Sequence, residues 1–207
     1  MKKYIFIVGA PGSKWSSIAK NIYYSPNIDR TDFNDNRTYA HSANGESNVM
    51  HIGAYFDPGM EFGQWFDRIE EFDVLSCETE FNRPFNGTGT RIIKSHVLSN
   101  HIDYLKRTWP DCRVVLVHRN NESCLDWWTK CGGFDITYPK YDMYYKDLNT
   151  MSEKIAEQNK NILAAWDNYM GVEINDNLAL CNVLEIEHPP SNYQQQYNIN
   201  DIRVKMI

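Results

Sequence analysis

Short runs with an apolar centre alternate along the chain with stretches in which apolar residues recur every three or four positions. The runs at residues 4–8, 91–96 and 112–119 predict strands of a buried sheet, and a fourth strand is expected at 178–186. The amphipathic stretches predict helices at 13–24, 61–72, 101–108, 122–130 and 150–169, and Ser152 is the expected cap of the last one. This alternation predicts an α/β fold in which one central parallel sheet is flanked by helices.

Two segments show no clear period. Residues 25–59 are polar and rich in Asn and Asp, which predicts a long irregular excursion. Residues 132–148 follow a Gly-Gly break and are rich in aromatic residues. Neither segment has the composition of a linker and no internal repeat is present, so we expect a single domain over residues 1–207.

Charge and composition narrow the classes of function. The chain carries 21 Lys and Arg against 27 Asp and Glu, a formal net charge of −6, which argues against binding duplex nucleic acid through the overall field. No apolar run approaches the roughly 18 to 20 residues of a membrane span, and no signal-peptide core is present, so we expect a cytoplasmic protein. Five cysteines without a C-x-x-C pair indicate neither a disulfide framework nor a zinc site, and no metal is expected.

Groups suited to an anion follow three of the four expected strands. The first strand leads into a helix through Gly9-Ala10-Pro11-Gly12-Ser13-Lys14, where backbone N–H groups, a helix N-terminus and an ammonium can cradle a phosphate. The second ends in Lys94-Ser95-His96, and the third ends in Arg119 beside another helix start. Because ligands bind beyond the carboxyl ends of parallel strands, these groups predict one anion site.

These residues resemble the sulfotransferases that use 3'-phosphoadenosine 5'-phosphosulfate. Ile7 to Ser13 is similar to the family's loop for the 5'-phosphosulfate, and Arg91 to His96 is similar to its Lys-[Ser/Thr]-His strand end. Val114 to Trp128 resembles the strand and helix that bind the 3'-phosphate. The resemblance covers most of residues 4–128 and implies a P-loop NTPase-like sulfotransferase architecture in a short, divergent member.

The resemblance also implies the roles of individual residues. The co-substrate would be bound by Arg119, by Ser123 and by the segment that forms the loop and the start of the first helix. That segment consists of Gly9, Ala10, Pro11, Gly12, Ser13, Lys14, Trp15 and Ser16. Trp15 has the spacing of a core residue as well as a place for stacking on the base. His96 would be the catalytic base, while Lys94 and Lys14 would stabilise the departing phosphate. Glu78 and Glu80 are weaker substitutes for the base.

Three departures from the family pattern stand out. The cation expected straight after the loop proline is Gly12, and the nearest ammonium is Lys14. The serine expected eight residues after Arg119 is Trp127, so Ser123 is taken as its substitute. No Gly-rich basic segment lies near the C-terminus.

The acceptor and two alternatives stay open. The expected acceptor is a hydroxyl or amine of a small molecule or carbohydrate, in a pocket built from residues 25–59 and 132–148. A P-loop kinase or NTPase opens in a similar way, although this loop lacks the Gly-Lys-[Ser/Thr] run of that motif. A non-catalytic nucleotide-binding relative is the third possibility. Oligomeric state is left open by the sequence.

Overall fold

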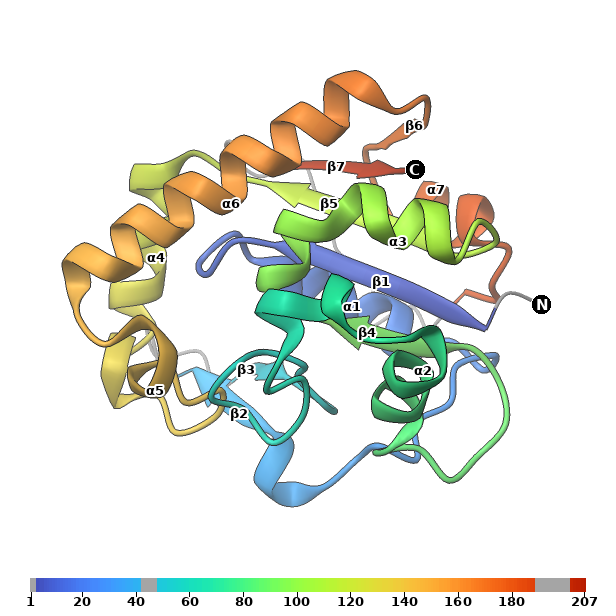
Figure 1. The fold of residues 1–207 in the computed structure, drawn as a ribbon, viewed down its shortest axis with the longest axis horizontal. Helices are drawn as coiled ribbons and strands as arrows, with labels where there is room; N and C mark the ends of the chain where they lie inside the picture. The colour runs from blue at the N-terminus through green and yellow to red at the C-terminus, as the bar shows by residue number, and fades with distance from the viewer. Residues whose placement is uncertain (1–2, 42–47, 189–201) are drawn as a thin grey trace.

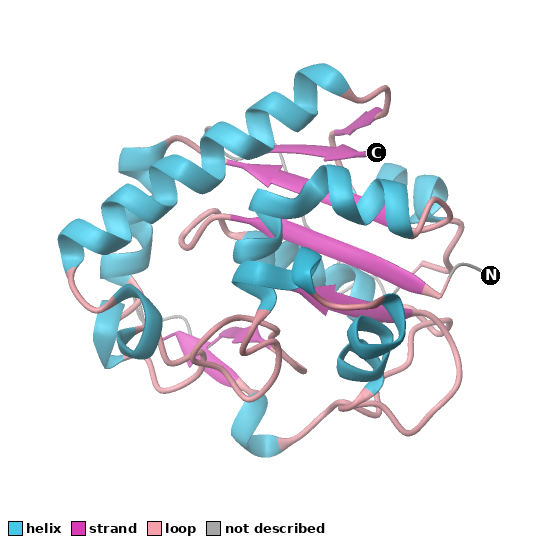
Figure 2. Cartoon of the chain, viewed as in Figure 1, coloured by secondary structure: helices cyan, strands magenta, loops and turns pink. Residues whose placement is uncertain are grey.

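A computed structural model describes residues 3–41, 48–188 and 202–207 of the chain. Its centre is a five-stranded sheet in the order β4-β1-β5-β7-β6 (Figures 1 and 2). The strands are β1 (Tyr4–Gly9), β4 (Arg91–Lys94), β5 (Arg113–His118), β6 (Val172–Ile174) and β7 (Arg203–Met206). A separate hairpin joins β2 (Tyr39–His41) to β3 (Asn48–His51).

The sheet is mixed, which corrects the expectation of a wholly parallel sheet. β1 pairs in parallel with β4 and β5, whereas β7 runs antiparallel to both β5 and β6. The three strands that carry the predicted anion groups therefore form the parallel part. The expected α/β class and the flanking helices are confirmed.

Helices cover both faces of the sheet (Figure 1). The α-helices are α1 (Trp15–Tyr23), α2 (Val74–Asn82), α3 (Ile102–Thr108), α4 (Asn121–Lys130), α5 (Asp142–Tyr145), α6 (Leu148–Asn168) and α7 (Asn177–Leu184). The 3₁₀ helices are η1 (Asp35–Arg37), η3 (Phe66–Glu71), η4 (Val97–His101) and η5 (Gly133–Asp135).

The alternation of side chains along β1 divides the core into two layers. Tyr4, Phe6 and Val8 pack into the cluster that contains residues of α3 and α6, whereas Ile5 and Ile7 pack into the cluster that contains residues of α1 and α7. All six residues of β1 are buried, as the apolar run predicts.

Four sequence predictions for single elements were wrong. Residues 178–186 form most of a helix rather than a strand, because Asp176 caps α7 by accepting a hydrogen bond from the Ala179 N–H at 2.8 Å. The helix expected at 61–72 is only the 3₁₀ helix η3. The long helix α6 begins at Leu148 and is capped by Asp147 rather than by Ser152.

The fourth error concerns residues 25–59, which are not wholly irregular. This stretch contains η1 and the described strands of the β2–β3 hairpin. The hairpin packs against α1 and so places its last residue, His51, beside the loop that follows β1.

Candidate active site beyond β1, β4 and β5

The segments that follow β1, β4 and β5 meet at one edge of the sheet. The three strands are neighbours and parallel, so their carboxyl ends point the same way. The His96 ring, after β4, donates from Nδ1 to the Gly9 carbonyl at the end of β1. Arg119, after β5, donates from Nη1 to the Gly12 carbonyl at 3.1 Å. The three predicted anion-binding segments are therefore in direct contact.

The loop between β1 and α1 turns tightly. The Ser13 N–H donates to the Ala10 carbonyl at 3.0 Å, and Gly12 adopts a φ of +79°. A methyl group on Gly12 would lie 1.9 Å from the Cys124 carbonyl of α4. A larger side chain, such as a lysine or arginine, has no room at this position, because α4 packs directly on the glycine.

Lys14 precedes α1 in a left-handed conformation, with a φ of 63°, and its side chain does not cap the helix. Its ammonium lies 4.2 Å from the centre of the Trp127 ring, and the Arg119 guanidinium lies 6.0 Å from the same ring. The two cations expected to meet an anion thus both lie near the indole of Trp127.

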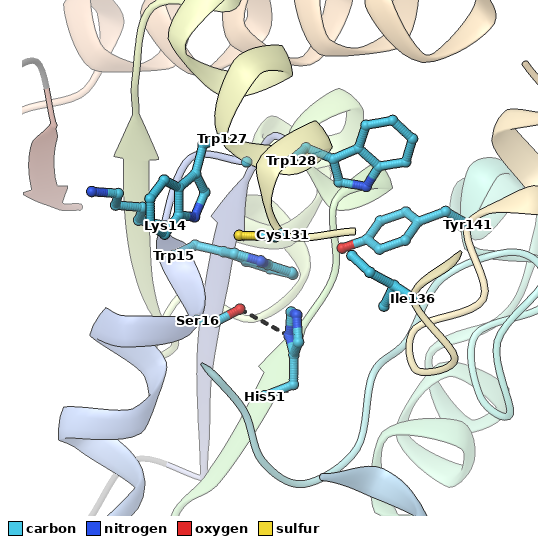
Figure 3. Close-up of a pocket in the computed structure, with 10 residues that line it drawn as sticks. Lys14, Trp15, Ser16, His51, Trp127, Trp128, Cys131, Ile136 and Tyr141 are labelled. Carbon is cyan, nitrogen blue, oxygen red and sulfur yellow. Dashed lines mark hydrogen bonds between the residues drawn. The ribbon is translucent and has the colours of Figure 1, made fainter. Parts of the chain in front are cut away.

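A small cavity lies beside this loop (Figure 3). Its volume is about 30 Å³, and its walls are Gly12, Lys14, Trp15, Ser16, His51, Trp127, Trp128, Cys131, Ile136 and Tyr141. Pockets for drug-sized ligands hold about 300 to 1,000 Å³. A nucleotide can therefore enter only if the wall moves. The partly buried Trp127 is the part of the wall that lies near both cations.

Lys94 and His96 do not line this cavity, contrary to the expectation that both project toward one bound group. The Lys94 ammonium donates to the Ile52 carbonyl, and burial lowers its pKa to about 8 although Asp32 opposes the change. His96 is fully buried under Trp15, with 4.1 Å between the ring centres. Burial lowers the pKa of His96 to about 3, so the imidazole is neutral at physiological pH.

The contact with Gly9 fixes the tautomer of His96. A carbonyl only accepts, so Nδ1 carries the proton and Nε2 keeps its lone pair. Within the described residues Nε2 has no hydrogen-bond partner. His96 has the electronic form of a base but is enclosed.

Ser13 and Ser123 occupy different environments. Ser13 is fully buried, and its Oγ has no hydrogen-bond partner among the described residues. Ser123 lies in the first turn of α4, where its N–H donates to Asn120 Oδ1 at 3.4 Å. Its side chain is not part of the cavity wall.

The two substitute bases lie away from the loop. Glu78 pairs with Lys3, just before β1, at 3.2 Å and accepts a hydrogen bond from Trp109 Nε1 at 3.1 Å. Glu80 accepts from Gly63 N and pairs with Arg83 at 2.9 Å. Lys3 is at the amino end of β1 and the loop is at its carboxyl end, so Glu78 lies at the opposite end of the strand from the predicted anion site.

The sequence analysis missed Asp57. Its Oδ1 accepts hydrogen bonds from Ser95 Oγ at 2.7 Å, His96 N at 2.9 Å and Val97 N at 3.2 Å. Its Oδ2 has no partner within the described residues, and the side chain is buried. Burial raises the pKa of Asp57 to about 7 against these hydrogen bonds. Asp57 fixes the segment that leaves β4.

A second missed group faces the cavity. Ser16 Oγ lies 3.0 Å from His51 Nδ1 and 2.8 Å from the Tyr55 hydroxyl, and the Tyr55 hydroxyl also contacts His51 Nδ1. Figure 3 shows the His51 ring rising from the hairpin toward Ser16 and the cavity. The sequence does not single out His51, because its partners lie 35 and four residues away and are assembled only by the packing of the hairpin.

A larger hollow is lined by Thr137 and Tyr138, which follow Ile136 of the small cavity in the sequence. It measures about 820 Å³ and is lined by Asn34, Asp35, Asn36, Arg37, Thr38, Gly59, Met60, Glu61, Thr137, Tyr138, Lys140 and Met143. Nearly all of these residues come from the two segments expected to build an acceptor pocket. Arg37 Nε donates to Glu61 Oε2 at 2.7 Å across its wall.

Comparison with known proteins gives no further assignment, since no protein-family model, curated protein or solved structure matches the chain. Over residues 3–41, 48–188 and 202–207, no helix is long and apolar enough to cross a membrane. The same residues contain no group of three His, Cys, Asp or Glu side chains arranged to hold a metal ion.

Proposed function

We propose that the chain is a sulfotransferase that moves a sulfuryl group from 3'-phosphoadenosine 5'-phosphosulfate to a hydroxyl or amine. The observation that carries the proposal is the meeting of the loop after β1 with His96 and Arg119, through their contacts with Gly9 and Gly12. These are the three segments that resemble the family, and they are adjacent although up to 110 residues separate them in the sequence.

The chemistry needs positive charge at the departing phosphate and a group that takes the acceptor's proton. In this proposal Lys14 and the N–H groups at the start of α1 meet the 5'-phosphosulfate, and Arg119 meets the 3'-phosphate. Both cations exchange their contact with the Trp127 indole for the anion. The 820 Å³ hollow receives the acceptor, a small molecule or carbohydrate.

A non-catalytic nucleotide-binding protein is the second candidate. It is favoured by the enclosure of His96 and by the 30 Å³ volume of the cavity beside the loop. A P-loop kinase or NTPase is the third candidate and requires a complex of magnesium with ATP.

Thermal unfolding separates these candidates. A ligand that binds only the folded chain stabilises it, and a ligand concentration of 100 times Kd raises the free energy of unfolding by about 2.7 kcal/mol. We expect adenosine 3',5'-bisphosphate to raise Tm without added metal. A rise with magnesium-ATP and none with millimolar bisphosphate would contradict the sulfotransferase proposal. Transfer of labelled sulfate then separates the enzyme from the non-catalytic relative.

A further inference from the structure

The cavity beside the loop is faced by a histidine that the family resemblance does not assign. His51 lines the cavity, whereas His96 lies beneath Trp15 and does not. Ser16 also lines the cavity and lies 3.0 Å from His51 Nδ1. A hydroxyl and an imidazole in hydrogen-bond reach of each other form a unit that can move a proton.

The hydrogen bonds allow a protonation pattern that suits proton transfer from Ser16 to His51. The Ser16 hydroxyl, the Tyr55 hydroxyl and His51 Nδ1 all contact one another, and each hydroxyl has one proton to donate. In the pattern that serves a relay, Tyr55 donates to Ser16 and Ser16 donates to His51 Nδ1. The ring proton is then on Nε2, and Nδ1 is the basic atom.

The position of this group suits transfer between two ligands. Ile136 lines the small cavity, and its neighbour Thr137 lines the 820 Å³ hollow. Thr38 lines the hollow, and its neighbour Tyr39 lies 6.0 Å from the His51 ring. His51 therefore lines the cavity on the proposed donor side, and sequence neighbours of Ile136 and Tyr39 line the hollow on the proposed acceptor side.

On the premise of the proposed sulfotransferase function, we propose that Ser16 and His51 form the proton relay of the reaction. The acceptor oxygen forms the new bond to sulfur, and the bond between sulfur and the phosphate oxygen breaks, leaving its electron pair on adenosine 3',5'-bisphosphate. The acceptor proton passes to Ser16 Oγ, whose own proton passes to His51 Nδ1. In this proposal the body of the acceptor lies in the hollow, its reacting oxygen reaches Ser16 beside the loop, and His51 acts through Ser16. His96 is left as a structural residue that joins β4 to β1.

The surroundings of His51 bear on its protonation. Among the described residues of the cavity wall, Lys14 is the one Lys or Arg, and Cys131 and Tyr141 are the other titratable residues beside His51. Burial raises the pKa of Cys131 to about 11 and that of Tyr141 well above its usual value, so both stay neutral. The rings of Tyr39 and Tyr55 also lie beside His51.

The test compares variants in labelled-sulfate transfer with water, glucose and p-nitrophenol as acceptors. We expect Ser16→Ala and His51→Gln to lower turnover by about a hundredfold or more, while the affinity for adenosine 3',5'-bisphosphate changes less than about threefold. The fall of wild-type turnover toward acid pH disappears in His51→Gln. Ser17→Ala, on the next residue of α1, and His101→Ala, at a histidine bound to Glu70 and Asp67, are the matched controls.

Each outcome decides between the two proposals. Loss of turnover in His96→Ala together with full turnover in His51→Gln would overturn the relay and leave the sulfotransferase standing. A wild-type chain that ignores the bisphosphate would contradict the proposed function itself. A chain that binds the bisphosphate but transfers nothing, even to water, would overturn the relay and favour the non-catalytic relative.

A measurement on the wild-type chain covers the case in which His51→Gln does not fold. Diethyl pyrocarbonate modifies accessible neutral imidazoles, and peptide mass spectrometry locates the modified residue. His51 is 6% exposed and lines the cavity, whereas His96 is 0% exposed, so we expect carbethoxylation of His51 to be faster than that of His96. We also expect at least a tenfold slower reaction of His51 when the bisphosphate is bound. Modification of His51 at the same rate with and without bisphosphate would place it outside the donor site and overturn the relay.

Discussion

Asp57 makes the stability of the protein depend on pH in a direction unusual for an aspartate. Burial raises the pKa of Asp57 from 3.8 to about 7, and the three hydrogen bonds to Oδ1 only partly offset the effect of burial. Between pH 4 and pH 7, Asp57 is therefore protonated in the folded chain and ionised in the unfolded chain. The difference is about three pKa units at about 1.4 kcal/mol each, so the contribution of Asp57 falls by about 4 kcal/mol over this range.

His96 acts in the opposite direction, which determines the design of the assay. Its folded pKa of about 3 means that the unfolded chain gains a proton first as the pH falls, so acid destabilises the fold through this group. The two effects offset each other in the wild-type chain. A comparison with Asp57→Asn isolates the carboxylate, because His96 is present in both proteins and an amide keeps an Oδ1 acceptor for Ser95, His96 and Val97.

Urea unfolding at pH 5 and pH 8 measures the difference. We expect Asp57→Asn to gain stability relative to wild type by about 2 to 4 kcal/mol between the two pH values. The gain arises because only the wild-type chain must bury a charge at pH 8. A constant difference at both pH values would refute the reasoning, since it would mean that Asp57 ionises equally in both states.

Two further substitutions test the packing around the site. Gly12→Ala should lower the free energy of unfolding by about 3 kcal/mol or more, because the added methyl group meets the Cys124 carbonyl. Gly132→Ala is the control: Gly132 has a φ of +117° but no neighbour nearer than 3.4 Å, so this substitution should lower the free energy of unfolding by only about 1 kcal/mol. Equal losses in urea unfolding would refute the close packing of α4 on Gly12. Tyr138→Phe should lower the free energy of unfolding by about 1 to 3 kcal/mol, because the Tyr55 N–H loses the hydroxyl oxygen that accepts its hydrogen bond at 3.0 Å. An unchanged Tm would show that this N–H finds another partner.

The parallel part of the sheet was predictable from local sequence. An apolar run buried on both faces has few alternatives, and the Gly-Pro loop after β1 marks its end. The contact of the loop with His96 and Arg119 followed from the topological rule on carboxyl ends of parallel strands. Residues 177–184 were harder because their apolar run suits a strand as well as a buried helix. Asp176 and the spacing of Leu180, Cys181 and Leu184 carried the helical signal.

The side-chain arrangement of the site depends on packing that no local pattern records. The hairpin places His51 beside Ser16, and α4 places Cys124 against Gly12. Burial of His96 depends on Trp15, whose helical spacing fitted a core position as well as a nucleotide base. The structure puts Trp15 in the core cluster with α1 and α7, where it covers the histidine.

Calorimetric titration of adenosine 3',5'-bisphosphate tests the central claim most directly. We expect Arg119→Ala to weaken its binding by about tenfold to a hundredfold and to leave adenosine 5'-phosphate binding nearly unchanged, because the lost contact is to the 3'-phosphate. Arg113→Ala is the matched control, since Arg113 lies at the other end of β5 and pairs with Glu185 at 3.5 Å. Equal losses for the two nucleotides, or no binding of the bisphosphate to the wild-type chain, would contradict a nucleotide site beyond β1, β4 and β5.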